Sequence, residues 1–117
     1  MTRIGAFFVG LSLVTFSTPA AAQYAMATGN DVLSVCDSTD SYGPVACANW
    51  ISGVAAGINA AQALGRSVVC FPPGSNVGQY RDIIVDALRR NPASRHLHAG
   101  PLALGYLARA FPCTTSR

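Results

Sequence analysis

Residues 44–65 read PVACANWISGVAAGINAAQALG and decide the fold, because their apolar side chains recur at the three- and four-residue spacing of a helix. The recurring positions are Cys47, Trp50 or Ile51, Val54, Ile58, Ala61 and Leu64. Pro44 suits the first helical turn, where its missing N–H costs nothing, and Gly65 suits the C-terminal cap. We therefore predict a long helix from about Val45 to Leu64.

Two glycines lie inside this predicted helix, four residues apart. Gly53 and Gly57 would share one side of it. Since Gly costs about 1 kcal/mol in a helix interior, the pair predicts the close approach of another helix.

Three shorter helices are expected around the long one. Thr28 or Asn30 caps a first helix that ends near Cys36, and Ser75 or Asn76 caps a third that runs to Arg90. Residues 66–74 form an extended segment rather than a sheet, because the run Val68–Phe71 is stopped by two prolines and a glycine.

The fourth helix is expected from about Ser94 to Ala110. Pro101 lies within that range, so the helix either kinks there or begins late. Its buried positions would be Leu97, Leu102 or Pro101, Leu104, Leu107 and Ala110 or Phe111. Together these elements predict an all-α, four-helix domain.

The four cysteines predict two disulfides. Cys36, Cys47, Cys70 and Cys113 contain no Cys-x-x-Cys pair of the kind that binds zinc. Four cysteines allow three connectivities, and sequence alone does not choose among them. Position along the chain favours a local pair, 36–47, and a long-range pair, 70–113.

The first 22 residues have the pattern of a signal peptide. Arg3 is followed by the apolar run Ile4–Phe16, which is too short to span a bilayer, and then by three small residues before Gln23. We therefore expect cleavage near Ala22-Gln23, a single exported domain over residues 23–117, and an oxidising compartment.

Charge excludes one class of function. Residues 23–117 hold seven Arg, five Asp, no Lys and no Glu, and the Arg residues form no basic stripe. An exported chain of this kind is not expected to bind nucleic acid.

No catalytic, metal or cofactor site is predicted. His96 and His98 are the two histidines, and residues two apart on a helix point away from each other. Four paired cysteines leave no free thiol for nucleophilic catalysis. The Gly-x-Ser-x-Gly elbow of hydrolases is missing as well. We expect a protein that is not an enzyme.

The order of motifs resembles the Rap1a/Tai family of immunity proteins. These motifs are Cys47-x-x-Trp50-Ile51-x-Gly53, Cys70-Phe71-Pro72-Pro73-Gly74, a helix that ends at Asn91-Pro92, and Phe111-Pro112-Cys113. The family usually has Tyr where Trp50 stands, Phe where Val69 stands and His where Asn91 stands. The resemblance spans roughly Asp31 to Cys113.

The resemblance implies a periplasmic inhibitor of a type VI secretion effector. Such proteins bind an amidase that cleaves peptidoglycan peptides and block its active-site cleft, and they are often dimers. They need no cofactor and no catalytic residue of their own.

No family motif marks the binding residues, so they are predicted from exposure and chemistry. The candidates are the loop Asp37–Tyr42 and a cluster between the last two helices, which we favour because Arg is frequent at binding hot spots. The cluster contains Arg89, Arg90, Asn91, Arg95 and His96.

Two other functions remain open. The chain is alternatively a periplasmic helical binding or stress module of the same fold without an effector partner. An acid-stress chaperone is disfavoured, because five Asp and no Glu offer few carboxylates for protonation to neutralise.

Overall fold

The computed structural model describes residue 14 and residues 26–114, and within them the chain forms four α-helices. In chain order they are α1 (Gly29–Cys36), α2 (Gly43–Ala63), α3 (Val77–Arg90) and α4 (Ala99–Ala110), with a short 3₁₀ turn, η1 (Pro92–Ser94), before α4. No β-strand occurs in this part of the chain, so the all-α prediction is confirmed. None of the described helices is both long and apolar enough to cross a membrane. Apart from Val14, the predicted signal peptide and its cleavage site lie outside the described residues.

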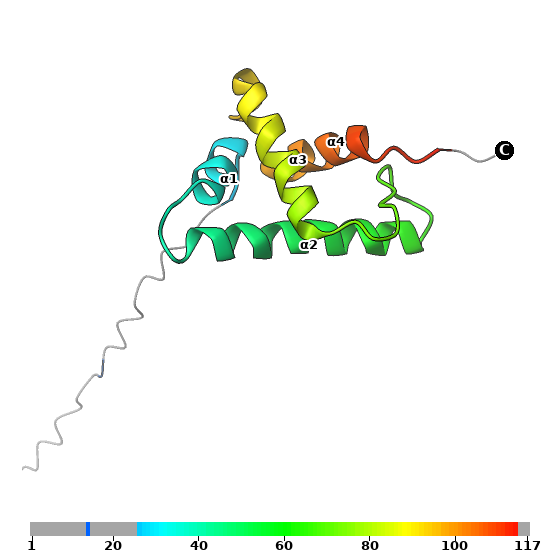
Figure 1. Cartoon of the computed structure of the whole chain (residues 1–117), viewed down its shortest axis with the longest axis horizontal. Helices are drawn as coiled ribbons and strands as arrows, with labels where there is room; N and C mark the ends of the chain where they lie inside the picture. Colours follow the sequence, from blue (N-terminus) through cyan, green and yellow to red (C-terminus); the bar gives the residue numbers. More distant parts are fainter. Residues whose placement is uncertain (1–13, 15–25, 115–117) are drawn as a thin grey trace, which may run out of the picture.

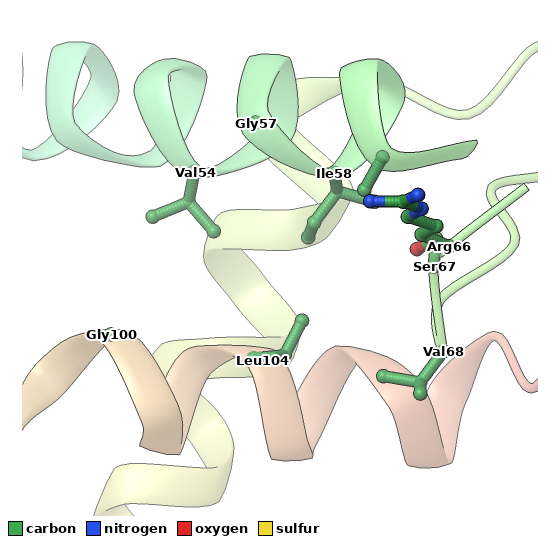
Figure 2. Close-up of a pocket in the computed structure, with 9 residues that line it drawn as sticks. Val54, Gly57, Ile58, Arg66, Ser67, Val68, Gly100 and Leu104 are labelled. Atoms are coloured by element: carbon green, nitrogen blue, oxygen red, sulfur yellow. The ribbon is translucent and has the colours of Figure 1, made fainter. Parts of the chain in front are cut away.

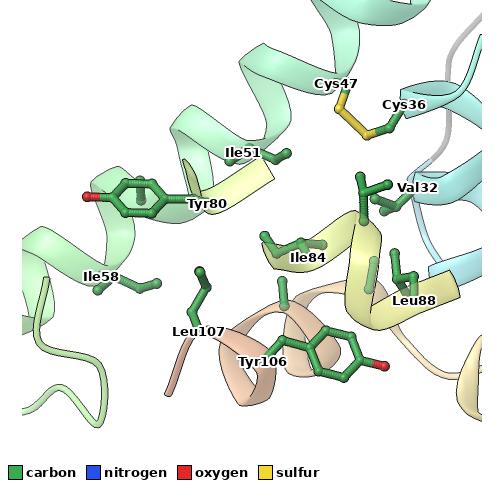
Figure 3. Close-up of a cluster of buried hydrophobic side chains, with 14 of the residues drawn as sticks. Val32, Cys36, Cys47, Ile51, Ile58, Tyr80, Ile84, Leu88, Tyr106 and Leu107 are labelled. Atoms are coloured by element: carbon green, nitrogen blue, oxygen red, sulfur yellow. A yellow bond between two sulfur atoms is a disulfide. The ribbon is translucent and has the colours of Figure 1, made fainter. Parts of the chain in front are cut away.

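Helices α2 and α4 both pack against α3, which crosses α2 (Figure 1). Helix α1 lies beside the N-terminal half of α2 and also contacts α3. The shared core is drawn in Figure 3, where side chains from all four helices meet. Its largest fully buried members are Ile51, Ile84, Leu88, Leu107, Val32, Val69 and Cys47.

Side-chain caps fix where α1 and α3 begin. Thr28 is the N-cap of α1, and its hydroxyl and backbone N–H each donate to the Asp31 carboxylate over 2.8 Å. These two bonds, the hydroxyl's first, lower the pKa of Asp31. Asn76 and Gln79 form the equivalent reciprocal pair at the start of α3.

Helix α2 confirms the prediction for residues 45–64 almost to the residue. Pro44 lies in its first turn, and Gly65 follows its C-terminal end with φ +66°. The Asp40 carboxylate accepts from the backbone N–H groups of Tyr42 and Gly43 at 2.9 and 2.6 Å, which caps the N-terminus. Gly43 is required there, because a Cβ would lie 2.4 Å from that of Ser38.

The prediction that Gly53 and Gly57 mark a close helix approach is wrong. A Cβ built on either residue meets nothing within 4 Å. Both glycines point into open space, because the core-facing side of α2 is the one that carries Ile51, Ala55 and Ile58.

Helix α4 begins later than about Ser94. Residues 92–94 form η1, and the helix proper begins at Ala99, so that Pro101 falls in its first turn, where its missing N–H is tolerated. Two of the predicted buried positions are exposed, Leu97 by 49% and Leu104 by 40%, whereas Leu107 is fully buried. The core face of α4 is instead made by Ala99, Ala103, Tyr106 and Leu107.

Both disulfides form as expected, Cys36–Cys47 and Cys70–Cys113. The first joins the end of α1 to the start of α2 and is buried. The second ties the extended segment after α2 to the end of α4, where the Cys70 N–H also donates to the Phe111 carbonyl over 2.9 Å. Val69 beside it forms an isolated bridge with Pro112 and is fully buried.

Candidate functional site

The cluster predicted to bind a partner lies at the C-terminal end of α3 and on the segment that leads to α4. Arg89 and Arg90 occupy the last turn of α3, Asn91 is its C-cap, and Arg95 and His96 follow η1. This end of α3 is the yellow tip in Figure 1. The structure therefore brings the predicted residues to one region of the surface.

Arg95 has a structural role within this region. Its guanidinium donates from Nε to the Leu88 carbonyl over 2.6 Å and from Nη2 to the Arg89 carbonyl over 2.9 Å. These carbonyls belong to the last turn of α3, so no later N–H group of the helix is available to donate to them. The Arg95 carbonyl in turn accepts from the Asn30 N–H at the start of α1. Arg95 thus joins the end of α3 to the beginning of α1.

Replacing Arg95 with Ala is expected to lower the free energy of unfolding by about 2 kcal/mol, since two charge-assisted hydrogen bonds in a partly buried position are lost. Arg90→Ala is the matched control. Its exposed pair with Asp86, one turn earlier, should contribute less than about 0.5 kcal/mol. Urea denaturation followed by circular dichroism measures both. Equal losses in the two variants would contradict the structural role of Arg95.

The other members of the cluster are more exposed to solvent than Arg95. Arg89 pairs with Asp37 at the end of α1, and Arg90 with Asp86 on its own helix. Asn91 donates from its side chain to the Ala87 carbonyl over 2.7 Å. His96 is exposed.

A shallow cleft of about 260 Å³ lies beside Arg90, between α3 and α4. Arg109 of α4 lines it together with Arg90, and Asp86 is the one acidic residue in its wall, so its charge is net positive. The remaining lining residues are Ile83, Ala87, Asn91 and Tyr106. An acidic or hydrogen-bonding group of a partner would fit this cleft.

The second predicted candidate, the loop Asp37–Tyr42, is built around the cap of α2. Asp40 is engaged in that cap, while Tyr42 as a residue is 73% exposed. Val45 follows on the first turn of α2 and is 58% exposed. An exposed tyrosine beside an apolar side chain is a common protein-binding feature.

A third surface was not predicted from the sequence. A groove of about 410 Å³ separates α2 from α4, and Val54 and Ile58 of α2 face Leu104 of α4 across it (Figure 2). Arg66 and Val68, on the segment after α2, lie at one end. Val68 and Leu104 are apolar, which is the trace of this groove in the sequence. Helical periodicity assigned Leu104 to the core, so the groove was not predicted.

Chemistry at other residues is limited in the described part of the chain. No group of three or more His, Cys, Asp or Glu residues there is arranged to hold a metal ion. All four cysteines are in disulfides. His98 is the N-cap residue of α4 and forms a backbone bridge with Thr28.

The described part of the chain is thus a small helical scaffold, held by two disulfides and carrying several exposed surfaces. Residues 28–113, more than half of the chain, match the family of Rap1a immunity proteins, and the chain belongs to that family. The resemblance read from the motifs is thereby confirmed. No curated protein and no solved structure matches the chain significantly.

Proposed function

We propose that this chain is a periplasmic immunity protein that binds a type VI secretion peptidoglycan amidase and blocks its active-site cleft. It would act after signal-peptide cleavage near Ala22-Gln23, as a monomer or a homodimer. The observation that carries the proposal is the match of residues 28–113 to the Rap1a immunity proteins.

The scaffold suits inhibition by binding. The Cys36–Cys47 disulfide holds α1 against α2, and Arg95 fixes the segment before α4 to the end of α3. A surface that is already ordered loses little conformational entropy when it binds, so more of the contact energy contributes to affinity. The chain itself needs no catalytic group for this function.

The contact surface we propose is formed by Arg90, Asn91 and His96 with the adjoining cleft. Arg90 is 73% exposed, and together with Arg109 it makes the cleft net positive. Carboxylates or carbonyl groups around an amidase cleft would receive bidentate hydrogen bonds from these guanidinium groups. Arg89 and Arg95, which the sequence placed in the same cluster, would orient this surface through their intramolecular contacts.

The test measures inhibition and binding with purified components. The oxidised protein, residues 23–117, is titrated into type VI peptidoglycan amidases acting on isolated peptidoglycan sacculi, and complexes are measured by calorimetry. We expect stoichiometric inhibition of one cognate amidase. If no amidase is bound or inhibited, the alternative of a helical module without an effector partner is favoured.

Arg90→Glu is expected to weaken the complex with the inhibited amidase about tenfold, since a rim cation becomes a repulsive anion. The variant should stay folded and lose only about 1 kcal/mol of stability, because the new repulsion from Asp86 and from the C-terminal end of α3 is exposed to solvent. Arg66→Glu makes the same charge reversal on a different surface and serves as the control. Unchanged affinity in Arg90→Glu would remove this surface from the proposal while leaving the immunity function intact.

A further inference from the structure

The groove between α2 and α4 differs in chemistry from the cationic cleft beside Arg90, because most of its lining is apolar. Both helices pack on α3 and have little contact with each other. Figure 2 shows Val54, Ile58, Leu104 and Val68 directed into the space between them. A volume of about 410 Å³ lies within the range of small-molecule sites.

Glycines open two sides of this groove without serving the fold. Gly57 of α2 and Gly100 of α4 line it, and a Cβ on either would meet nothing within 4 Å. Neither position has a side chain to fill the groove, so the backbones of both helices stay accessible from it. A glycine at such a position lets a bound molecule approach the helix backbone closely.

Among the described residues that line the groove, Arg66 is the one charged side chain. Arg66 lies at one end, and within the described residues it makes no hydrogen bond or ion pair. None of the lining residues that the structure describes is acidic. The hydroxyl of Ser67 next to it is engaged with the Val69 carbonyl over 2.7 Å. A ligand with one anionic group would therefore pair with Arg66 and place its remainder along the apolar walls.

The apolar walls favour an alkyl chain over a peptide. A peptide segment in the groove would bring backbone N–H and C=O groups against Val54, Ile58 and Leu104, which offer no hydrogen bond, and an unsatisfied polar group is costly to bury. An alkyl chain has no such groups. We propose that the groove binds a single-chain fatty-acid anion, with its carboxylate on Arg66 and its chain between α2 and α4.

The first test uses dodecanoate as the probe. The delipidated, oxidised protein is titrated with dodecanoate below its micellar concentration by calorimetry, and with dodecan-1-ol for comparison. We expect saturable binding of one dodecanoate per chain, about tenfold tighter than the alcohol, since the alcohol lacks the charge that meets Arg66. Arg66→Gln should reduce this difference to less than threefold. Failure of dodecanoate to saturate, or equal affinity for the alcohol, overturns the proposal.

The second test fills the groove. Gly57→Leu places a side chain in the groove and should weaken dodecanoate binding at least tenfold. We expect the thermal midpoint to be kept, because apart from the adjoining residues and backbone of α2 nothing lies within 4 Å of the new Cβ. Gly53→Leu is the matched control, on the same helix and equally open but outside the groove. The control should bind dodecanoate like the unmodified protein.

Other occupants of the groove give different results. If a second copy or an amidase covers it, Gly57→Leu will disrupt that complex and dodecanoate will not bind the unmodified protein, which would overturn the proposal. Amidase inhibition is measured on the same variants. We expect inhibition to be unchanged in Gly57→Leu, so the experiment tests the fatty-acid site and the immunity function independently of each other.

Discussion

Replacing Cys70 and Cys113 together with Ser is expected to lower the free energy of unfolding by about 4 kcal/mol. The crosslink closes a loop between residues separated by 43 positions, so its loss returns a large amount of conformational freedom to the unfolded chain. A domain of this size buries a modest fraction of its surface, and such a change is large relative to its total stability.

Few contacts other than this disulfide hold the extended segment after α2 to the end of α4. The extended segment after α2 lies against the end of α4 through this disulfide, one backbone hydrogen bond and the bridge between Val69 and Pro112. Phe71 on the segment stacks on Tyr80 with ring centroids 4.0 Å apart and meets Phe111 edge-on. These contacts remain in the variant without the disulfide, but each aromatic pair contributes only about 1 kcal/mol, so they do not replace the crosslink.

The measurement is urea denaturation of the oxidised protein and of the double Ser variant, followed by circular dichroism. Cys70 is exposed, so serine there buries no new polar group. The Cys36–Cys47 disulfide is intact in both proteins, so the difference in stability reports the Cys70–Cys113 crosslink alone. A loss of less than 1 kcal/mol would mean that the unfolded chain is already restricted by other contacts.

The fold was predictable where short-range chemistry decides it. The capping residues Thr28 and Asn76, the position of Pro44 and the glycine after α2 all act within a few residues of themselves. The pairing of Cys36 with Cys47 is similarly local, and it left Cys70 and Cys113 to pair with each other. These features required no knowledge of how the helices pack.

Predictions that depended on long-range packing were less successful. Residues 95–97 were expected to be helical, but the carbonyls of Arg95 and Leu97 accept from the first two N–H groups of α1, on Asn30 and Gly29. That interaction joins parts of the chain more than 60 positions apart, and no pattern within either segment announces it. The open faces around Gly53 and Gly57 were misread for the same reason.

The candidate site shows the same division. The sequence placed Arg89, Arg90 and Arg95 close to Asn91, and in the structure they lie at the end of α3 and just after η1, because these positions are adjacent along the chain. It did not separate Arg95, which bonds inward to two carbonyls, from Arg90, which faces solvent. Both have the same side chain, and only the path of the backbone decides which carbonyls lie within reach.

Leu104 and Leu107 show most clearly where helical periodicity fails as a predictor of burial, because it placed both side chains in the core. Three residues apart on α4, they differ in exposure from 40% to 0%. Leu107 points into the core in Figure 3, whereas Leu104 points into the groove in Figure 2. The two helices that flank the groove have little contact with each other, so a side chain that periodicity assigns to the core reaches open space instead.

Leu107→Ala is therefore expected to lower the free energy of unfolding by roughly 3 to 4 kcal/mol, since it removes a fully buried side chain and leaves a cavity. Leu104→Ala, the matched control, should cost less than about 0.5 kcal/mol, because its side chain is already in contact with water. Urea denaturation of both variants measures the difference.

The same pair of variants also distinguishes the fold from the groove. Leu104→Ala should weaken dodecanoate binding in a fully folded protein, because it removes one wall of the groove. Similar stability losses in the two variants would mean that α4 is rotated about its axis and that the groove is closed in solution.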